Sequence, residues 1–136
     1  MNKTTQPNIT MSYPDITDAE RQAVLDVLHT PNLAMGPKND AFEEAIAKFA
    51  GAKHAITVNS GTAGLHLCVR AAGIKQNDLV VTTPFSFVSS SNVMLFEKAI
   101  PVFVDVDPVS GNIDPLKVAE AVRELKRGGQ GARRLL

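Results

Sequence analysis

Apolar residues recur at helical spacing in the first third of the chain, and strand-like runs begin only near residue 55. Thr17 and Glu20 have the spacing of a capping box, in which each side chain binds the other's backbone N–H. The apolar stripe that follows predicts a helix ending near His29. A second helix is predicted around residues 42–49, with Gly51 as its C-cap residue.

The second half of the chain alternates between strand and helix patterns. Short apolar strands are predicted at residues 55–58, 79–82 and 101–105. Helices are predicted over residues 65–72 and 87–98 and from Pro115 onward, with Asp114 as N-cap. This alternation is typical of right-handed crossover units around a mostly parallel sheet. The predicted fold class is therefore α/β, a partial and mostly parallel sheet with flanking helices.

Composition limits the classes of protein that fit this pattern. The chain has 136 residues, 44% of them hydrophobic and 21% charged, which is ordinary for a globular domain. Fourteen Lys and Arg balance fourteen Asp and Glu, so bulk charge supports neither a nucleic-acid nor a membrane partner. The single Cys68 and the lack of a signal-peptide pattern before Tyr13 favour a cytoplasmic location. Residues 1–13, polar and aperiodic, are predicted to form an N-terminal arm.

The strongest candidate site is the turn between the predicted strand at residues 55–58 and the next helix. Its residues Ser60, Gly61, Thr62 and Ala63 are small, so the backbone can approach a ligand closely. The N–H groups that open a helix bind anions, and a phosphate is the natural one here. The turn matches neither a Walker loop nor a dinucleotide fingerprint. Taken alone, the pattern fits an ordinary tight turn equally well.

Further candidates follow the other two predicted strands. Phe85 and Phe87 come after the second strand, where one ring could stack on a planar ligand or belong to the core. Asp105 and Asp107 lie at the end of the third strand, where either could bind a substrate group or cap the next turn, and capping is the favoured role.

The histidines and the cysteine give no sign of a metal or a nucleophile. His29, His54 and His66 form no pair at metal-ligand spacing, so we expect no metal site. His66 is predicted to face the strands as a half-buried imidazole with a hydrogen-bond partner. Cys68 lies in an apolar helix pattern and is predicted to be a core residue.

The order of these motifs is more specific than any one of them. The chain resembles the first part of the DegT/StrS-type nucleotide-sugar aminotransferases, which are pyridoxal-phosphate enzymes of fold type I. The matching motifs are Tyr13-Pro14-Asp15-Ile16, Met35-Gly36-Pro37, Phe42-Glu43, the run from Asn59 to His66, Pro84-Phe85-Ser86-Phe87-Val88, Asn92, and the run from Pro101 to Asp107. The resemblance extends from about residue 12 to residue 125.

The resemblance implies a role for several residues. The turn of Ser60, Gly61, Thr62 and Ala63 would hold the phosphate of pyridoxal 5'-phosphate, Phe87 would stack on its ring, and Asn92 would be the family's asparagine in the following helix. Gly36 and Pro37 would lie near the substrate. The implied substrates are a nucleotide-linked keto sugar and an amino donor, glutamate. The implied assembly is a homo-oligomer with shared active sites.

The family's Schiff-base lysine lies beyond the part that this chain resembles. Residues 14–136 are therefore predicted to be an incomplete cofactor-binding large domain, without a catalytic residue of its own and inactive alone. Two alternatives remain open at this point. One is a non-catalytic α/β module that binds a phosphorylated ligand or self-associates, and the other is a fold type I lyase or decarboxylase.

Overall fold

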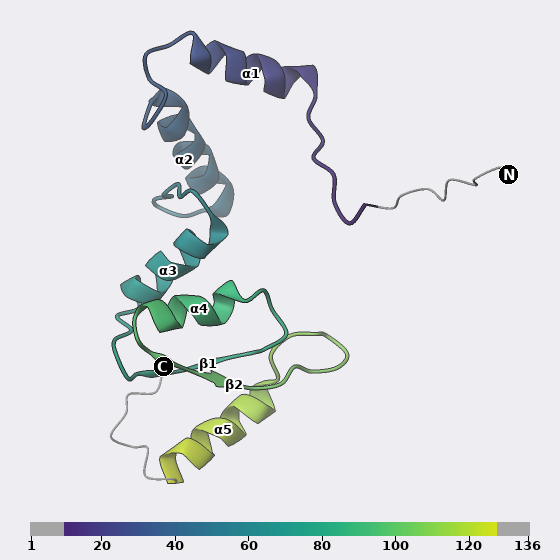
Figure 1. Cartoon of the computed structure of the whole chain (residues 1–136), viewed down its shortest axis with the longest axis vertical. Helices are drawn as coiled ribbons and strands as arrows, with labels where there is room; N and C mark the ends of the chain where they lie inside the picture. Colours follow the sequence, from purple (N-terminus) through teal and green to yellow (C-terminus); the bar gives the residue numbers. More distant parts are fainter. Residues whose placement is uncertain (1–9, 128–136) are drawn as a thin grey trace, which may run out of the picture. The chain divides into compact units, whose positions relative to one another are not determined.

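A computed structural model gives the structure of the chain and describes residues 10–127 (Figure 1). These residues form five helices and two strands, which agrees with the predicted α/β class. The chain divides into two compact units, Met1–Thr57 and Val58–Leu136, and the described residues of each unit are treated by themselves. Among the described residues, no helix combines the length and the apolar character that crossing a membrane requires.

Helix α1 (Asp18–Leu28) begins at the predicted capping box. Thr17 Oγ1 accepts a hydrogen bond from Ala19 N–H at 3.2 Å, and the Glu20 carboxylate accepts one from Thr17 N–H at 2.6 Å. These bonds supply partners to N–H groups that a helix start leaves unpaired. The prediction of this helix from local sequence is therefore confirmed.

Helix α2 (Pro37–Ala50) starts earlier than its apolar stripe predicts. Pro37 occupies the first helical position, where its fixed φ suits the helix and its missing N–H costs nothing. The helix ends at Gly51, which takes the left-handed conformation with φ 64° and confirms the predicted C-cap.

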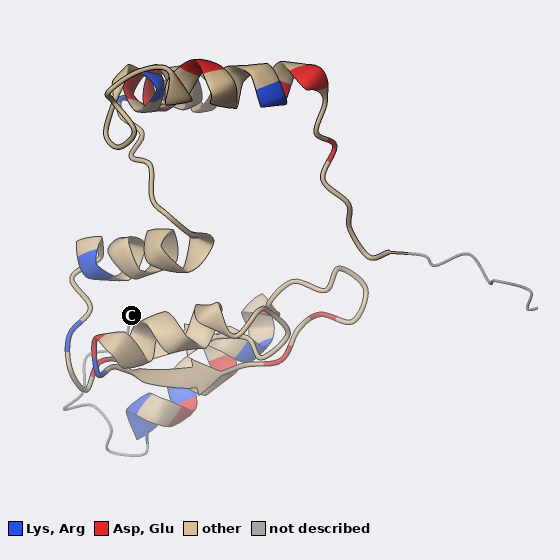
Figure 2. Cartoon of the chain, turned by 45° about the horizontal axis from the view of Figure 1, so that its top comes forward, with Lys and Arg blue, Asp and Glu red and all other residues tan. Residues whose placement is uncertain are grey.

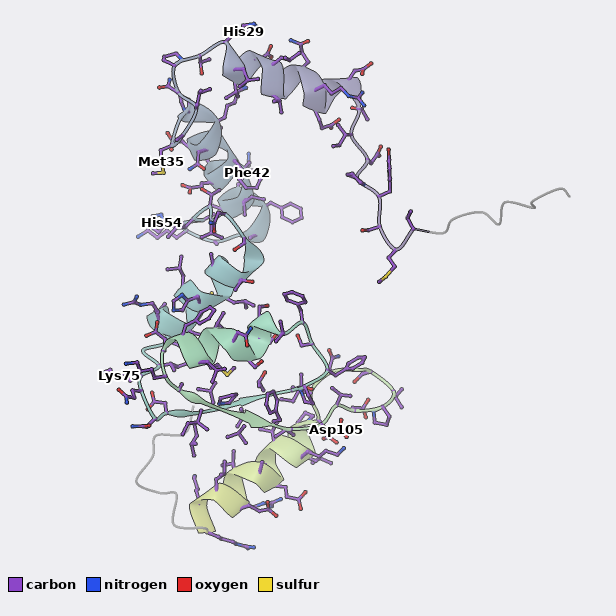
Figure 3. The ribbon with its side chains drawn as sticks, in the orientation of Figure 1. His29, Met35, Phe42, His54, Lys75 and Asp105 are labelled. Atoms are coloured by element: carbon purple, nitrogen blue, oxygen red, sulfur yellow. The ribbon has the colours of Figure 1, made fainter. Side chains whose placement is uncertain are left out.

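The apolar stripes of α1 and α2 face solvent in this structure. None of the described residues of this unit is buried, and Phe42 is 56% and Phe49 92% exposed. Figure 3 shows the Phe42 ring extending away from its helix. Both helices thus present an uncovered apolar face.

The second unit contains a parallel pair of strands, β1 (Leu79–Thr82) and β2 (Ile100–Phe103). They pair in register from Leu79 opposite Ile100 to Thr82 opposite Phe103. Both strands lie within one or two residues of the predicted positions.

The predicted strand at residues 55–58 does not form. This segment belongs to no strand, and Ile56 is 79% exposed. A strand needs a neighbour to satisfy its backbone groups, and the described residues offer none here. The Thr57 N–H instead donates to Glu43 Oε1 at 2.7 Å, so a side chain takes the place of a sheet partner.

Three further helices complete this unit: α3 (Gly61–Ala71), α4 (Ser89–Phe96) and α5 (Pro115–Arg127). Helix α4 packs on the sheet and on α3, and α5 lies on the opposite side of the sheet (Figure 1). The core between α4 and the sheet is small and consists of Ile74, Val80, Val93, Met94 and Ala99.

Two other predictions concern the edges of this unit. Cys68 is exposed, so its predicted core role is wrong: the packing of α3 against α4 leaves this side chain uncovered. Asp114 caps α5 as predicted, with its Oδ1 accepting the Leu116 N–H at 2.8 Å.

The predicted N-terminal arm, residues 1–13, lies largely outside the described residues. Its residues 10–13 are exposed.

Candidate functional site

Helix α3 begins directly at the turn that the sequence singles out. Ser60 is the N-cap, with extended backbone, and its Oγ accepts a hydrogen bond from Ala63 N–H at 3.1 Å. Its carbonyl oxygen accepts the Gly64 N–H, also at 3.1 Å. The helix therefore starts four residues before the predicted Leu65 and includes most of the candidate site in its first turn.

The first two N–H groups of α3 are open. Within residues 10–127, the N–H groups of Gly61 and Thr62 have no hydrogen-bond acceptor. A Cβ placed on Gly61 would meet nothing within 4 Å, and the first turn holds no acidic residue. Figure 2 shows charge only near the C-terminal end of α3. An anion can therefore approach these N–H groups unopposed, whereas it reaches Ala63 N–H only if the Ser60 hydroxyl turns away.

Phe87 and Asn92, for which the family resemblance implies contact with the cofactor, belong to the same unit as the turn at Ser60. Phe87 precedes α4 and is 75% exposed, as is the neighbouring Phe85 at 72%, so neither is a core residue. Asn92 lies within α4 and is half-buried. The next residue, Val93, is only 2% exposed and belongs to the core, so this face of α4 packs inward. The ring of Phe87 is thus free to stack, and Asn92 stands on an anchored helix.

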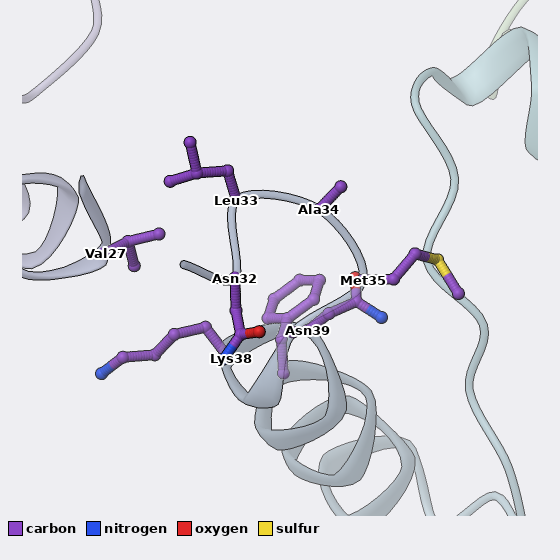
Figure 4. A pocket seen from close by; sticks show the side chains of 9 residues that line it. Val27, Asn32, Leu33, Ala34, Met35, Lys38 and Asn39 are labelled. Carbon is purple, nitrogen blue, oxygen red and sulfur yellow. The ribbon is translucent and has the colours of Figure 1, made fainter. Parts of the chain in front are cut away.

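Gly36 lies in the other unit and lines a pocket of about 330 Å³ (Figure 4). The pocket lies among the end of α1, the following loop and the start of α2. Gly36 is required there, since a Cβ would stand 2.9 Å from Asn32 Cβ. Pro37 follows it as the first residue of α2 and does not line the pocket. Lys38 supplies the only charged side chain of the lining.

A hydrogen-bonded cluster of Asn39, Glu43 and Thr57 was not predicted. Glu43 Oε1 lies 2.7 Å from both the Thr57 N and the Thr57 Oγ1, and 3.3 Å from Asn39 Nδ2. The bond from the Thr57 N–H lowers the pKa of Glu43, and the Thr57 hydroxyl lowers it further. These hydrogen bonds hold Thr57 against α2. In the sequence only the Phe42-Glu43 motif pointed to one of the three residues, because Thr57 lies 14 and 18 residues from its partners.

Asp105 and Asp107 act as caps. Asp105 accepts the Val106 N–H at 2.8 Å and lies 3.4 Å from Lys117 Nζ, and these contacts lower its pKa. Figure 3 shows Asp105 between β2 and the start of α5. The pKa of Asp107 is lowered chiefly by the Ser110 N–H, which donates to Oδ1 at 2.7 Å. The favoured structural role of both carboxylates is confirmed.

The sequence profile of the DegT/DnrJ/EryC1/StrS aminotransferase family matches residues 14–128. The chain belongs to this family. The profile thus spans both units and includes every candidate residue described above.

Two curated relatives are similar in sequence to most of this chain. The spore coat polysaccharide biosynthesis protein SpsC of Bacillus subtilis is 45% identical over 111 residues, which are 82% of this chain and 28% of SpsC. The UDP-4-amino-4-deoxy-L-arabinose–oxoglutarate aminotransferase of Shewanella sediminis is 42% identical over 94 residues, 69% of this chain and 24% of that enzyme.

The solved structures give the same result. Spr1654 from Streptococcus pneumoniae, in its PLP form, superposes with a TM-score of 0.80 at 30% identity, covering 84% of this chain and 29% of Spr1654. The chain therefore spans less than a third of the length of these relatives. Its match is to the N-terminal part of pyridoxal-phosphate-dependent sugar aminotransferases.

Proposed function

We propose that this chain is the amino-terminal part of an aminotransferase that uses pyridoxal 5'-phosphate to convert a nucleotide-linked keto sugar into an amino sugar. The observation that carries the proposal is the pair of open N–H groups, Gly61 and Thr62, at the start of α3. They stand at the position where the family resemblance expects the cofactor phosphate.

The donor set suits this cofactor. A phosphate ester needs several N–H and hydroxyl donors and no nearby carboxylate, and the first turn of α3 meets both conditions. Ser60 and Thr62 add hydroxyls that can turn toward the phosphate. Phe87 would cover one face of the ring, and Asn92 would contact the cofactor from α4. When bound, the cofactor serves as an electron sink during transfer of the amino group.

The proposed substrates follow from the relatives and from the pocket at Gly36. The Shewanella enzyme is named for a UDP-linked amino sugar and oxoglutarate, the keto acid that glutamate becomes when it donates its amine. The Gly36 pocket, with Lys38 beside it, could accept part of such a substrate, while Pro37 fixes the start of α2 below it. SpsC is named for polysaccharide biosynthesis, and we place the product of this enzyme in the same class of pathway.

The chain alone is proposed to lack transaminase activity and to act as part of a homo-oligomer in the cytoplasm. The chain spans less than a third of these relatives, and the family resemblance implies that the Schiff-base lysine belongs to the remaining part. Pyridoxal phosphate followed by borohydride reduction and peptide mapping tests this point. We expect low, scattered labelling of exposed lysines, and one lysine labelled in stoichiometric yield would contradict the proposal.

A second experiment tests the phosphate site itself. Thr62→Pro and Thr62→Ala both lose the hydroxyl, but only the proline variant also loses the N–H, and proline is tolerated in the first turn of a helix. Phosphate binding is followed by NMR titration of the Gly61 amide. We expect Thr62→Pro to bind at least tenfold more weakly than Thr62→Ala, the size of a lost charge-assisted hydrogen bond. Equal affinities would refute the site.

One alternative has an observation in its favour. The exposed apolar faces of α1 and α2, including Leu28 at 61% and Phe49 at 92%, suit a module that only self-associates. Such a module would sediment as an oligomer and bind no phosphate. Phosphate binding that depends on Thr62 would exclude it.

A further inference from the structure

A half-buried polar contact joins α3 to the end of α4. His66 Nε2, on α3, lies 2.6 Å from Oε1 of Glu97, the C-cap residue of α4. The two side chains are only 31% and 22% exposed. The His66 ring also meets the Phe96 ring edge to face, with centroids 5.3 Å apart and planes at 73°. His66 is thus held by two consecutive residues of the other helix.

The contact differs from an ordinary surface ion pair because it is partly buried and includes a third side chain. Arg70, one turn after His66 on α3, places its Nε 3.7 Å from the same Glu97 oxygen. Among the described residues, His66 and Arg70 are the basic side chains of α3 that contact the Glu97 carboxylate. Partial burial and two points of attachment restrict the sliding and rotation of α3 on α4.

Both helices carry proposed cofactor residues toward their N-terminal ends. Thr62 precedes His66 by four residues, about 6 Å along α3, and Asn92 precedes Glu97 by five, about 7.5 Å along α4. A contact that fixes one helix against the other therefore also fixes the phosphate turn relative to Asn92.

We propose that His66 is a positioning residue, which acts through Glu97 and Phe96 to hold the phosphate-binding turn at a set distance from the groups that contact the cofactor ring. The inference rests on the proposed function. It implies that His66 affects ligands that span both helices and leaves those bound by the turn alone unaffected.

The test compares two ligands on the full chain. Inorganic phosphate needs only the turn, whereas pyridoxamine 5'-phosphate also engages the ring-binding residues and has no aldehyde to couple with lysines. His66→Leu should weaken pyridoxamine phosphate binding about tenfold and change phosphate binding less than twofold. His66→Gln places an amide N–H where Nε2 stands and should stay within about threefold of the unchanged chain.

A matched control breaks another ion pair of the same unit. Lys117→Met removes the contact with Asp105 and should leave both affinities unchanged. Two results would overturn the positioning role while the proposed function stands: no loss of either ligand in His66→Leu, or equal loss of both, which would indicate general damage to α3. If the unchanged chain binds neither ligand, the proposed function and this inference both fail.

Discussion

Replacement of Val93 tests whether the small core beneath α4 supports the second unit. Val93 is 2% exposed and packs in the cluster formed with Ile74, Val80, Met94 and Ala99. Val93→Ala removes two methyl groups, which at about 0.8 kcal/mol each is about 1.6 kcal/mol of lost burial. The residual cavity adds to this, so the expected loss is about 2–3 kcal/mol.

This loss is large beside the roughly 5–15 kcal/mol that stabilises an ordinary domain. Urea unfolding followed by circular dichroism measures it. Val109→Ala is the matched control, since the same two methyl groups are lost from a side chain that is 93% exposed. The control should shift the free energy of unfolding by no more than about 0.5 kcal/mol. If the two variants unfold at the same urea concentration, the assignment of the core is wrong.

Three further predictions concern single interactions. Thr17→Ala removes the capping box and should destabilise α1 by about 1 kcal/mol, seen as faster amide exchange in that helix alone. Lys98 has a left-handed φ of 57°, so Lys98→Gly should raise the free energy of unfolding by about 1 kcal/mol in urea titrations; a decrease would contradict this. The hydrogen bond from the Thr57 N–H lowers the pKa of Glu43 in the folded chain below its ordinary value of 4.5. This bond therefore stabilises the fold fully above pH 4.5, and the stabilisation is lost as the pH falls through the lowered pKa. NMR of the Thr57 amide should show this loss, and Glu43→Gln should abolish the pH dependence.

Much of the candidate site follows from local sequence. The turn of small residues between Ser60 and the helix was predicted, although the Ser60 cap was not, and α3 starts four residues before the predicted Leu65. The box at Thr17 and the Asp114 cap were predicted, and their hydrogen bonds reach only two or three residues along the chain. Such features need no distant partner, so a sequence pattern is enough to predict them.

Two predictions failed because they depend on distant partners. Residues 55–58 have strand-like composition, but pairing needs a neighbouring strand, and Glu43 from α2 binds the Thr57 N–H instead. Cys68 has an apolar setting in sequence, yet it lies on a side of α3 that nothing covers among the described residues. In both cases the sequence gives the apolar character of the segment. Contacts with distant residues decide whether the segment pairs as a strand and whether the side chain is buried.

By itself, the sequence determined the caps at Thr17, Gly51 and Asp114, the two strands that pair, the order of motifs and, through that order, the family. Only the tertiary structure decided that residues 55–58 pair with no strand while the Thr57 N–H binds Glu43, and that His66 meets Glu97 31 residues away. The physical reason is the range of the interactions. Capping and helical periodicity act within one turn of the chain, whereas burial and contacts between helices exist only once distant segments have packed together.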